Sequence, residues 1–435
     1  MKTQTVADSH RCRRAVRWLG VLCLTAGLVP GMARGQSLDA RQWGEDLDVL
    51  VRELTRRHAA PETERPIQSF AADVERVRSG LSSMSRDEAA LEFARLAASF
   101  GDSHTELPLG QAALGFHRYP LGLYFFGADL RVVAVEPAHE QLLGWRLVSI
   151  GDQAVAKVLE RIKPFIADDF GNPHELSHSA PAFLAIPEVL IGLGIAARTG
   201  PIRYVFDNDD GRRVSASFTP MSFPDSAAAM TARVLRADGP LFARERDRWY
   251  LAAHVDATDI LYLRINRSQD QSKRESLAAF TRRVSVEIKR GGVSRVVIDL
   301  RQNTGGNFHK TDPLADAICG LAKNGVVSRV YVILGRHTYS AAIVLAARFK
   351  HGCDAQFVGE VPRAVPNRQA DVERFRLPNT RLEISYSSRL RPAFPELGDA
   401  TTIPLDLPAP WTWEAYRMGR DLALEAILRL TSNGQ

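Results

Sequence analysis

Apolar runs alternate with segments of helical periodicity from about residue 255 through most of the C-terminal half of the chain. Short runs rich in Val, Ile and Leu predict strands at 260–265, 296–300, 330–334 and 355–358. Between them, apolar residues at helical spacing predict helices at 276–289, 312–322 and 340–349. Strands and helices that alternate in this way predict a mainly parallel sheet covered by helices. A last helix is expected at 414–430.

The N-terminal part of the chain, residues 39–101, is predicted to be helical. One helix presents an apolar face at i, i+3, i+4 and i+7 spacing, formed by Leu47, Leu50, Val51 and Leu54. A second helix is expected to begin at Ser85, because Glu88 follows three residues later and completes a capping box. That helix should end near residue 99.

The middle of the chain is predicted to be rich in β structure. Strands are expected at 121–126, 130–135 and 147–150, followed by a helix at 155–162. A hairpin is expected farther on, with strands at 203–206 and 213–218 and a turn at 209–211. The order of strand, strand, glycine turn, strand, turn and helix over 116–168 resembles a PDZ domain. A generic β-rich insertion is the alternative.

The first 35 residues have the pattern of a secretory signal peptide. Arginines at positions 11, 13, 14 and 17 precede an apolar stretch at 18–28 that is too short to span a bilayer. Ala33-Arg-Gly35 offers small residues for cleavage, so the mature chain should begin at Gln36. Cleavage predicts a periplasmic or secreted protein with no transmembrane span, whereas an uncleaved membrane anchor is the alternative.

Cleavage changes what the net charge implies. The whole chain carries 56 basic and 50 acidic residues. Residues 1–35 contain six of the basic residues and one of the acidic residues, so the mature chain has a net charge of only +1. The basic character therefore belongs largely to the signal peptide and gives no support for nucleic-acid binding.

Two cysteines, Cys319 and Cys353, remain after cleavage. Their spacing matches no metal site, and no cofactor is expected. In an oxidising compartment they could pair, but two independent buried thiols explain the sequence equally well.

Ser340 has the position expected of a nucleophile, because it follows a predicted strand and begins a predicted helix. The free N–H groups and positive dipole end of a helix N-terminus favour an alkoxide and an oxyanion. Gly305 and Gly306 follow the preceding strand and offer further backbone N–H groups. The sequence thus predicts a serine hydrolase whose oxyanion hole uses the N–H of Gly305 or Gly306 and that of Ala341.

Several short motifs around these residues resemble the C-terminal processing (tail-specific) peptidases and their tricorn-like relatives. The motifs are Gly101-Asp-Ser-His-Thr105, Asp299-Leu-Arg-x-Asn-Thr-Gly-Gly306, Thr338-Tyr-Ser-Ala-Ala342, Val358-Gly-Glu360, Ile403-Pro-Leu-Asp406 and Gly419-Arg-Asp421. The resemblance covers most of residues 40–430. It implies an α/β, crotonase-like (ClpP/crotonase-type) catalytic core with a PDZ-like insertion, and Ser340 at the position of the family's nucleophile.

The general base differs from that of the best-known members, which use a Lys shortly after the Val-Gly-Glu motif. Val365 occupies that position, and no Lys follows Lys350. Arg363 cannot replace it, because a guanidinium stays protonated. His104 is the natural candidate base, since Asp102-Ser-His-Thr105 resembles the Ser-His pair of the tricorn type. Ser103 would belong to the same relay, and His309 and His337 are competitors.

A carboxylate should orient the base or complete a tetrad. The resemblance implies that it lies downstream of the nucleophile. Glu396 is the preferred candidate, and three further carboxylates remain open: Glu360, Glu383 and Asp406.

The sequence therefore predicts an exported serine endopeptidase that acts on a peptide or an unfolded protein. The expected divisions are a signal peptide (1–35), a helical region (36–115), a PDZ-like domain (116–168), a connecting region with a hairpin (169–250) and the α/β peptidase core (251–435). Two alternatives use the same fold: an inactive peptide-binding scaffold, and an esterase acting through the same site. The oligomeric state stays open.

Overall fold

The computed structural model describes residues 38–59, 67–169, 172, 174–236 and 238–432. The expected signal peptide lies outside these residues. Within the described ranges, none of the helices has both the length and the apolar character needed to cross a membrane.

The C-terminal half contains a six-stranded sheet in the order β15-β12-β11-β10-β9-β8. Its strands are β8 (Tyr250–His254), β9 (Ile260–Ile265), β10 (Arg295–Asp299), β11 (Arg329–Leu334), β12 (Gln356–Gly359) and β15 (Leu407–Pro408). All neighbours pair in parallel except β8, which is antiparallel to β9. The predicted parallel sheet is confirmed, and β8 was missed.

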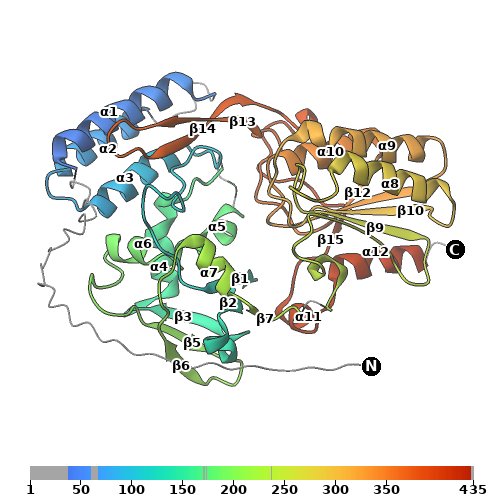
Figure 1. The fold of residues 1–435 in the computed structure, drawn as a ribbon, viewed down its shortest axis with the longest axis horizontal. Coiled ribbons are helices and arrows are strands. Elements are labelled where there is room, and N and C mark those ends of the chain that lie inside the picture. Colours follow the sequence, from blue (N-terminus) through green and yellow to red (C-terminus); the bar gives the residue numbers. More distant parts are fainter. Residues whose placement is uncertain (1–37, 60–66, 170–171, 173, 237, 433–435) are drawn as a thin grey trace, which may run out of the picture. The chain divides into compact units, whose positions relative to one another are not determined.

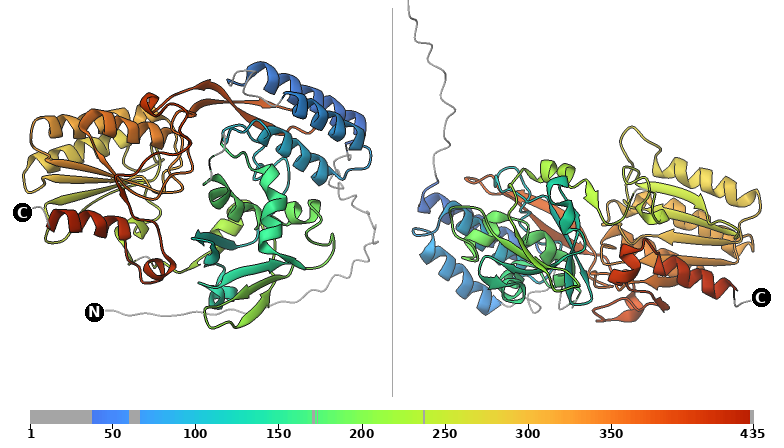
Figure 2. Two further views of the ribbon diagram at one scale, coloured as in Figure 1. Left: turned by 180° about the vertical axis from the view of Figure 1, so that it is seen from behind. Right: turned by 90° about the horizontal axis from the view of Figure 1, so that it is seen from below.

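Helices cover both faces of this sheet (Figures 1 and 2). Three of them, α8 (Leu277–Lys289), α9 (Asp312–Lys323) and α10 (Ala341–Cys353), lie together on one face. Helix α12 (Leu422–Ser432) covers the other face. Because both faces are covered, every residue of β9 is buried, which agrees with the apolar character of all its residues except Arg264.

The single helix expected at 414–430 is wrong. The structure has α11 (Trp413–Arg417) and then α12, separated by Gly419 with a φ of 67°. A left-handed residue of this kind ends a helix, and glycine adopts it without a steric penalty.

A disulfide joins Cys319 of α9 to Cys353 at the end of α10. The question that the sequence left open is thereby answered. The bond ties together two helices that lie side by side on the same face of the sheet.

The N-terminal region is helical, as predicted. It contains the two expected helices, α1 (Ala40–Arg57) and α3 (Arg86–Ala98), and between them α2 (Ile67–Gly80), which was not predicted as a separate helix. The expected capping box is present, because Ser85 and Glu88 exchange side-chain and backbone hydrogen bonds. The apolar faces of α1 and α3 meet in the core, where Trp43 packs edge-on against Phe93.

An antiparallel seven-stranded sheet occupies the middle of the chain. Its strands are β1 (Leu121–Phe126), β2 (Asp129–Val135), β3 (Arg146–Ile150), β4 (Gln153–Ala154), β5 (Tyr204–Asp207), β6 (Arg213–Ala216) and β7 (Ala232–Arg233). Four helices accompany it: α4 (Val155–Ile162), α5 (Glu175–Phe183), α6 (Pro187–Gly192) and α7 (Phe223–Ala229). The sheet continues past residue 168, because the predicted hairpin joins it through β5.

A long hairpin that the sequence analysis missed connects the C-terminal half to the N-terminal helices. Its strands are β13 (Ala370–Arg376) and β14 (Glu383–Leu390). The buried carboxylate of Asp46 in α1 accepts hydrogen bonds from the backbone N–H groups of Asn379 and Thr380 at the turn. The hairpin therefore fixes α1 from a position more than 300 residues away in the sequence.

Candidate active site

Ser340 lies between strand β11 and helix α10 in an unusual backbone conformation. Its φ is 55° and its ψ is −125°, a region that residues other than glycine rarely occupy. The side chain of Thr338 fixes the turn, because it donates to the carbonyl of Leu300 and accepts from the N–H of Gly335. Ser340 does not cap its helix through its side chain. The simple capping role is thereby excluded.

Gly305 packs directly against Ser340. A Cβ placed on Gly305 would lie 2.8 Å from the Cβ of Ser340, and its φ of 100° also favours glycine. The N–H of Gly305 is already used, because it donates to the side-chain oxygen of Asn303. Within the described residues, the N–H groups of Gly306 and Ala341 make no hydrogen bond. These two groups are therefore the available donors for an oxyanion.

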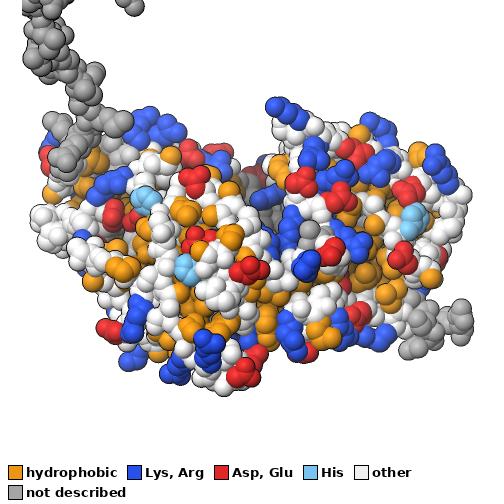
Figure 3. All heavy atoms as spheres, turned by 60° about the horizontal axis from the view of Figure 1, so that its bottom comes forward, with side chains coloured by type: hydrophobic (Ala, Val, Ile, Leu, Met, Phe, Trp, Pro, Cys, Tyr) orange, Lys and Arg blue, Asp and Glu red, His pale blue; other side chains and the backbone are white. Residues whose placement is uncertain are grey.

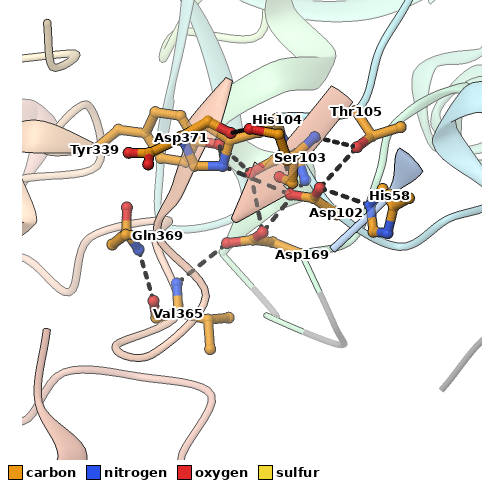
Figure 4. Close-up of polar contacts among 12 residues, drawn as sticks. His58, Asp102, Ser103, His104, Thr105, Asp169, Tyr339, Val365, Gln369 and Asp371 are labelled. Carbon is orange, nitrogen blue, oxygen red and sulfur yellow. Dashed lines mark hydrogen bonds and ion pairs between the residues drawn. The ribbon is translucent and has the colours of Figure 1, made fainter. Parts of the chain in front are cut away.

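His104 lies in a buried polar cluster beside the residue that precedes Ser340 (Figure 4). Its Nδ1 is 2.7 Å from the hydroxyl of Tyr339, and the two rings stack with centroids 4.5 Å apart. Asp102 accepts from the backbone N–H of His104 and places a carboxylate oxygen 3.5 Å from Nδ1. His58, at the end of α1, contacts the other carboxylate oxygen of Asp102 at 3.0 Å.

Ser103 extends this cluster on the other side of Tyr339. The hydroxyls of Ser103 and Tyr339 are 2.5 Å apart, and Ser103 donates to Asp169 at 3.0 Å. An ionised Asp169 can only accept hydrogen bonds. The Ser103 hydroxyl therefore donates to Asp169, and the Tyr339 hydroxyl donates to Ser103. In that arrangement His104 carries its proton on Nδ1. Its Nε2 then has a free lone pair, and this atom is buried without a partner in the described structure.

The electrostatics of the two aspartates differ. Burial opposes the ionisation of Asp102, but hydrogen bonds from His104 and His58 outweigh it and lower the pKa of Asp102. Burial, together with the charges of Asp102 and Glu175, raises the pKa of Asp169 to about 6. One carboxylate thus stays ionised beside His104, and the other titrates within the range in which enzymes work.

The structure does not join Ser340 to His104 by a hydrogen bond. Ser340 opens instead onto a cavity of about 460 Å³ that is also lined by Gly306, Ala341 and His309. His309 is a surface residue that lies 3.4 Å from Asp312. The third histidine, His337, packs against the ring of His178, and burial beside two arginines lowers the pKa of His337 to about 4.

Glu396 is not the carboxylate that orients His104. It lies on the surface and pairs with His351 at 2.9 Å, whereas Asp102 is the carboxylate next to His104. The other open candidates serve the architecture. Glu360 accepts from Tyr124 and Arg336, Glu383 pairs with arginines of β13, and Asp406 accepts from Phe357 and Lys350. Their position downstream of Ser340 could not distinguish these uses from an orienting role.

The Asp299-Leu-Arg motif also serves the architecture. Arg301 is buried, bonds Asp299 through its Nε and makes a two-pronged ion pair with Asp421 at 2.9 and 3.0 Å. The ring of Phe242 lies against the same guanidinium, 4.5 Å from its carbon. The Gly-Arg-Asp421 motif and the Asp-Leu-Arg motif therefore belong to one buried ion cluster that holds the C-terminal segment to the sheet.

The run His174-Glu-Leu-Ser-His178 has the spacing of a zinc-peptidase motif, which sequence reasoning did not note. The structure places its residues differently. Glu175 pairs with Arg363 at 3.0 Å and accepts from Ser179. No group of three His, Cys, Asp or Glu side chains in the described ranges is arranged to hold a metal ion.

Sequence reasoning missed three members of the His104 cluster: His58, Asp169 and Tyr339. Tyr339 had a usable signal, because it lies next to the proposed nucleophile. His58 and Asp169 had none, since they lie 44 and 66 residues from their partners Asp102 and Ser103.

The charged side chains on the face shown in Figure 3 are of mixed sign. Lys and Arg are interspersed there with Asp and Glu. This surface agrees with the nearly neutral mature chain inferred from the composition.

Comparison with known proteins places the fold. No family model and no curated protein matches the chain. Mature CPAF complexed with lactacystin matches with 14% identity and a TM-score of 0.63, over 90% of this chain and 97% of that chain. Mature CPAF alone gives 13% identity and a TM-score of 0.64, over 91% and 98%. The photosystem II D1 C-terminal processing protease matches with 14% identity and a TM-score of 0.42, over 89% and 96%.

The two CPAF matches show that the chain has the mixed α/β fold of CPAF.

Proposed function

We propose that this protein is a serine peptidase of the C-terminal processing and tricorn-like group, with Ser340 as its nucleophile. The observation that carries the proposal is the strained, uncapped backbone of Ser340 at the start of α10, next to the free N–H groups of Gly306 and Ala341. Strain of this kind persists where the surrounding structure requires it, often at active sites. The shared fold of CPAF and the order of the motifs support the same proposal.

We assign the general base to His104. Its Nε2 accepts the proton of the Ser340 hydroxyl while Oγ attacks the carbonyl carbon of a peptide bond. The oxyanion receives hydrogen bonds from the N–H groups of Gly306 and Ala341. The tetrahedral intermediate then expels the amine, which takes the proton from His104, and water hydrolyses the acyl-enzyme by the reverse sequence.

Asp102 and His58 are proposed as positioning residues for this base. Asp102 stays ionised and stabilises the imidazolium that forms on His104, while His58 holds Asp102. Ser340 and His104 are not hydrogen-bonded in the structure, so the base must engage when substrate binds. Catalytic hydrogen bonds are often long in a free enzyme and shorten in the substrate complex.

A fluorophosphonate probe tests the nucleophile directly. The mature chain should be labelled at Ser340, and Ser340→Ala should abolish both labelling and peptide hydrolysis without loss of folding. A labelled wild-type site would exclude the inactive scaffold. Parallel assays on short esters and peptides then separate an esterase from a peptidase.

His309 is the rival base, because it shares the cavity of Ser340. The matched variants His104→Ala and His309→Ala distinguish the two. With His104 as base, His104→Ala should be nearly as damaging as Ser340→Ala, the double variant little worse, and His309→Ala mild. A rate that rises with pH only near 10, about the pKa of an unperturbed Lys, would instead require a lysine base such as Lys310.

We further propose export to the periplasm or the cell exterior. The pattern of the first 35 residues motivates this location, and the Cys319–Cys353 disulfide supports it, since such bonds persist in oxidising compartments. Detection of a mature N-terminus at Gln36 in the exported protein would test the proposed export. We also propose that the core is crotonase-like and that residues 116–168 form a PDZ-like domain.

A further inference from the structure

A second cavity, of about 260 Å³, lies next to the His104 cluster and is separate from the cavity of Ser340. Helices α3, α5 and α7 and the segment 103–110 contribute to its wall. Ser103 belongs both to the His104 cluster and to this wall, whereas the two cavities have no lining residue in common. A ligand in the second cavity would therefore touch the cluster without entering the site of Ser340.

Most of the wall of this second cavity is apolar. Its apolar side chains include Leu107, Phe165, Ile166, Phe183 and Phe223. An apolar cavity of about 150 Å³ is enough to hold a benzene ring, so the larger cavity here has room for a ring with a polar group attached. Ligand sites in proteins combine apolar walls of this kind with a few polar groups that orient the ligand.

The charged side chains in the wall are two carboxylates and one guanidinium, those of Glu106, Glu175 and Arg363. Glu175 is buried, and Arg363 and Ser179 both donate to its Oε1. Its Oε2 is buried without a hydrogen-bond partner in the described structure. A buried polar atom without a partner is uncommon in folded proteins and calls for a ligand or water.

Glu106 supplies a second carboxylate without a partner. It is exposed, lines the cavity, and makes no side-chain hydrogen bond or ion pair with the described residues. The surrounding protein removes water from this carboxylate and raises its pKa, so a bound cation would stabilise its ionised form. Because the one guanidinium of the wall already pairs with Glu175, the cavity has an excess of negative charge.

We propose that this cavity binds a small organic monocation, in which an amidine, guanidine or primary amine is attached to one apolar ring or short chain. The cationic group lies between the carboxylates of Glu106 and Glu175, and the apolar body packs against Phe165 and Phe183. An amidine or guanidine suits such a site because its planar N–H groups can donate two parallel hydrogen bonds to a carboxylate. The site goes beyond the proposed peptidase, because binding requires neither Ser340 nor turnover.

Benzamidine, an aromatic cation, is the probe, and benzamide is its neutral counterpart of similar shape. Affinity is measured by ligand-detected ¹H NMR titration of the mature chain. Glu106→Gln removes the charge of the exposed carboxylate and keeps its shape, whereas Glu160→Gln makes the same change at an exposed position outside the cavity. Ala182→Phe fills the cavity from an exposed position in its wall and changes no charge.

Benzamidine should bind at least about tenfold more tightly than benzamide, as expected for hydrogen bonds to a charged group. Glu106→Gln should raise the Kd of benzamidine about tenfold, while Glu160→Gln should change it less than about twofold. Ala182→Phe should abolish detectable binding. Equal affinities for benzamidine and benzamide, or a benzamidine Kd that neither Glu106→Gln nor Ala182→Phe changes, would overturn the proposal.

Val372→Trp separates this site from that of Ser340. Val372 is exposed and lines the Ser340 cavity but not the second one, so the larger ring narrows the Ser340 cavity alone. Benzamidine should bind to this variant within about twofold of its affinity for the parent chain. A loss of binding in Val372→Trp, with normal binding in Ala182→Phe, would assign the cation to the Ser340 cavity and refute the proposal. Fluorophosphonate labelling of Ser340 tests the peptidase independently of either result.

Discussion

Replacing Ser340 by glycine should stabilise the protein more than replacing it by alanine. Both substitutions remove a hydroxyl that makes no hydrogen bond in the described structure, so they differ mainly in backbone freedom. A non-glycine residue held at φ 55° and ψ −125° costs about 1–3 kcal/mol, and glycine relieves that cost. Glycine loses about 0.5–1 kcal/mol more than alanine through the entropy of the unfolded chain. The expected net advantage of glycine is about 1 kcal/mol.

The assay is equilibrium unfolding in urea of Ser340→Gly and Ser340→Ala, compared at equal slopes of the transition. Ser285 provides a matched control, because it lies inside α8 and its hydroxyl donates to the carbonyl of Thr281 in ordinary helical geometry. There the order should reverse, and Ser285→Gly should be less stable than Ser285→Ala by about 1 kcal/mol. Neither variant at position 340 should hydrolyse peptides.

An alanine variant at position 340 that is as stable as the glycine variant would refute the reasoning. Such a result would mean that the backbone of Ser340 carries no strain. The assignment of Ser340 as the nucleophile depends on this backbone strain and would then lose its main support. The control at Ser285 guards against a general effect of glycine on the unfolded chain.

Three further substitutions test other parts of the structure. Asp421→Ala leaves the buried Arg301 without its two-pronged partner and should lower the free energy of unfolding by about 3–5 kcal/mol; a loss below about 1 kcal/mol in urea unfolding would contradict the role of this cluster. Asp169 has a folded-state pKa raised from 3.8 to about 6, so between these values the folded protein holds a proton that the unfolded chain has released. The free energy of unfolding should therefore fall by on the order of 3 kcal/mol as the pH rises through this window. Asp169→Asn should remove this contribution from the difference in unfolding free energy between pH 4 and pH 7. A difference that is the same in the variant and the wild type would contradict the prediction. Gly305→Ala brings a Cβ to 2.8 Å from the Cβ of Ser340 and should slow fluorophosphonate labelling at least about tenfold, whereas labelling at the wild-type rate would show that the contact can relax.

Much of the fold followed from local pattern. The strand at 260–265 and the helix at 155–162 were predicted with the bounds that the structure has, because a short, largely apolar run favours a buried strand and an apolar stripe at helical spacing favours a helix. The prediction of one continuous last helix was wrong at Gly419, where a single left-handed residue divides one apolar pattern into two helices. The β13–β14 hairpin was not predicted, because its exposed, charged strand β13 has no apolar face of its own.

The candidate site was predictable only where its chemistry is local in the sequence. Ser340, Gly306 and Ala341 lie at strand ends and a helix start, which a pattern can locate. The partners of His104 come from the end of α1 and from residue 169, and only the tertiary fold brings them together. Glu396 was misplaced for the same reason, since its position along the chain does not show which histidine it faces.

Val365 connects its loop to the His104 cluster through its backbone. The backbone N–H of Val365 donates to Asp169 at 3.1 Å, so this loop anchors one carboxylate of the cluster. Asp169 in turn accepts from Ser103, whose hydroxyl meets that of Tyr339 beside His104. Any residue except proline can supply that N–H, so this contact does not depend on the side chain at position 365.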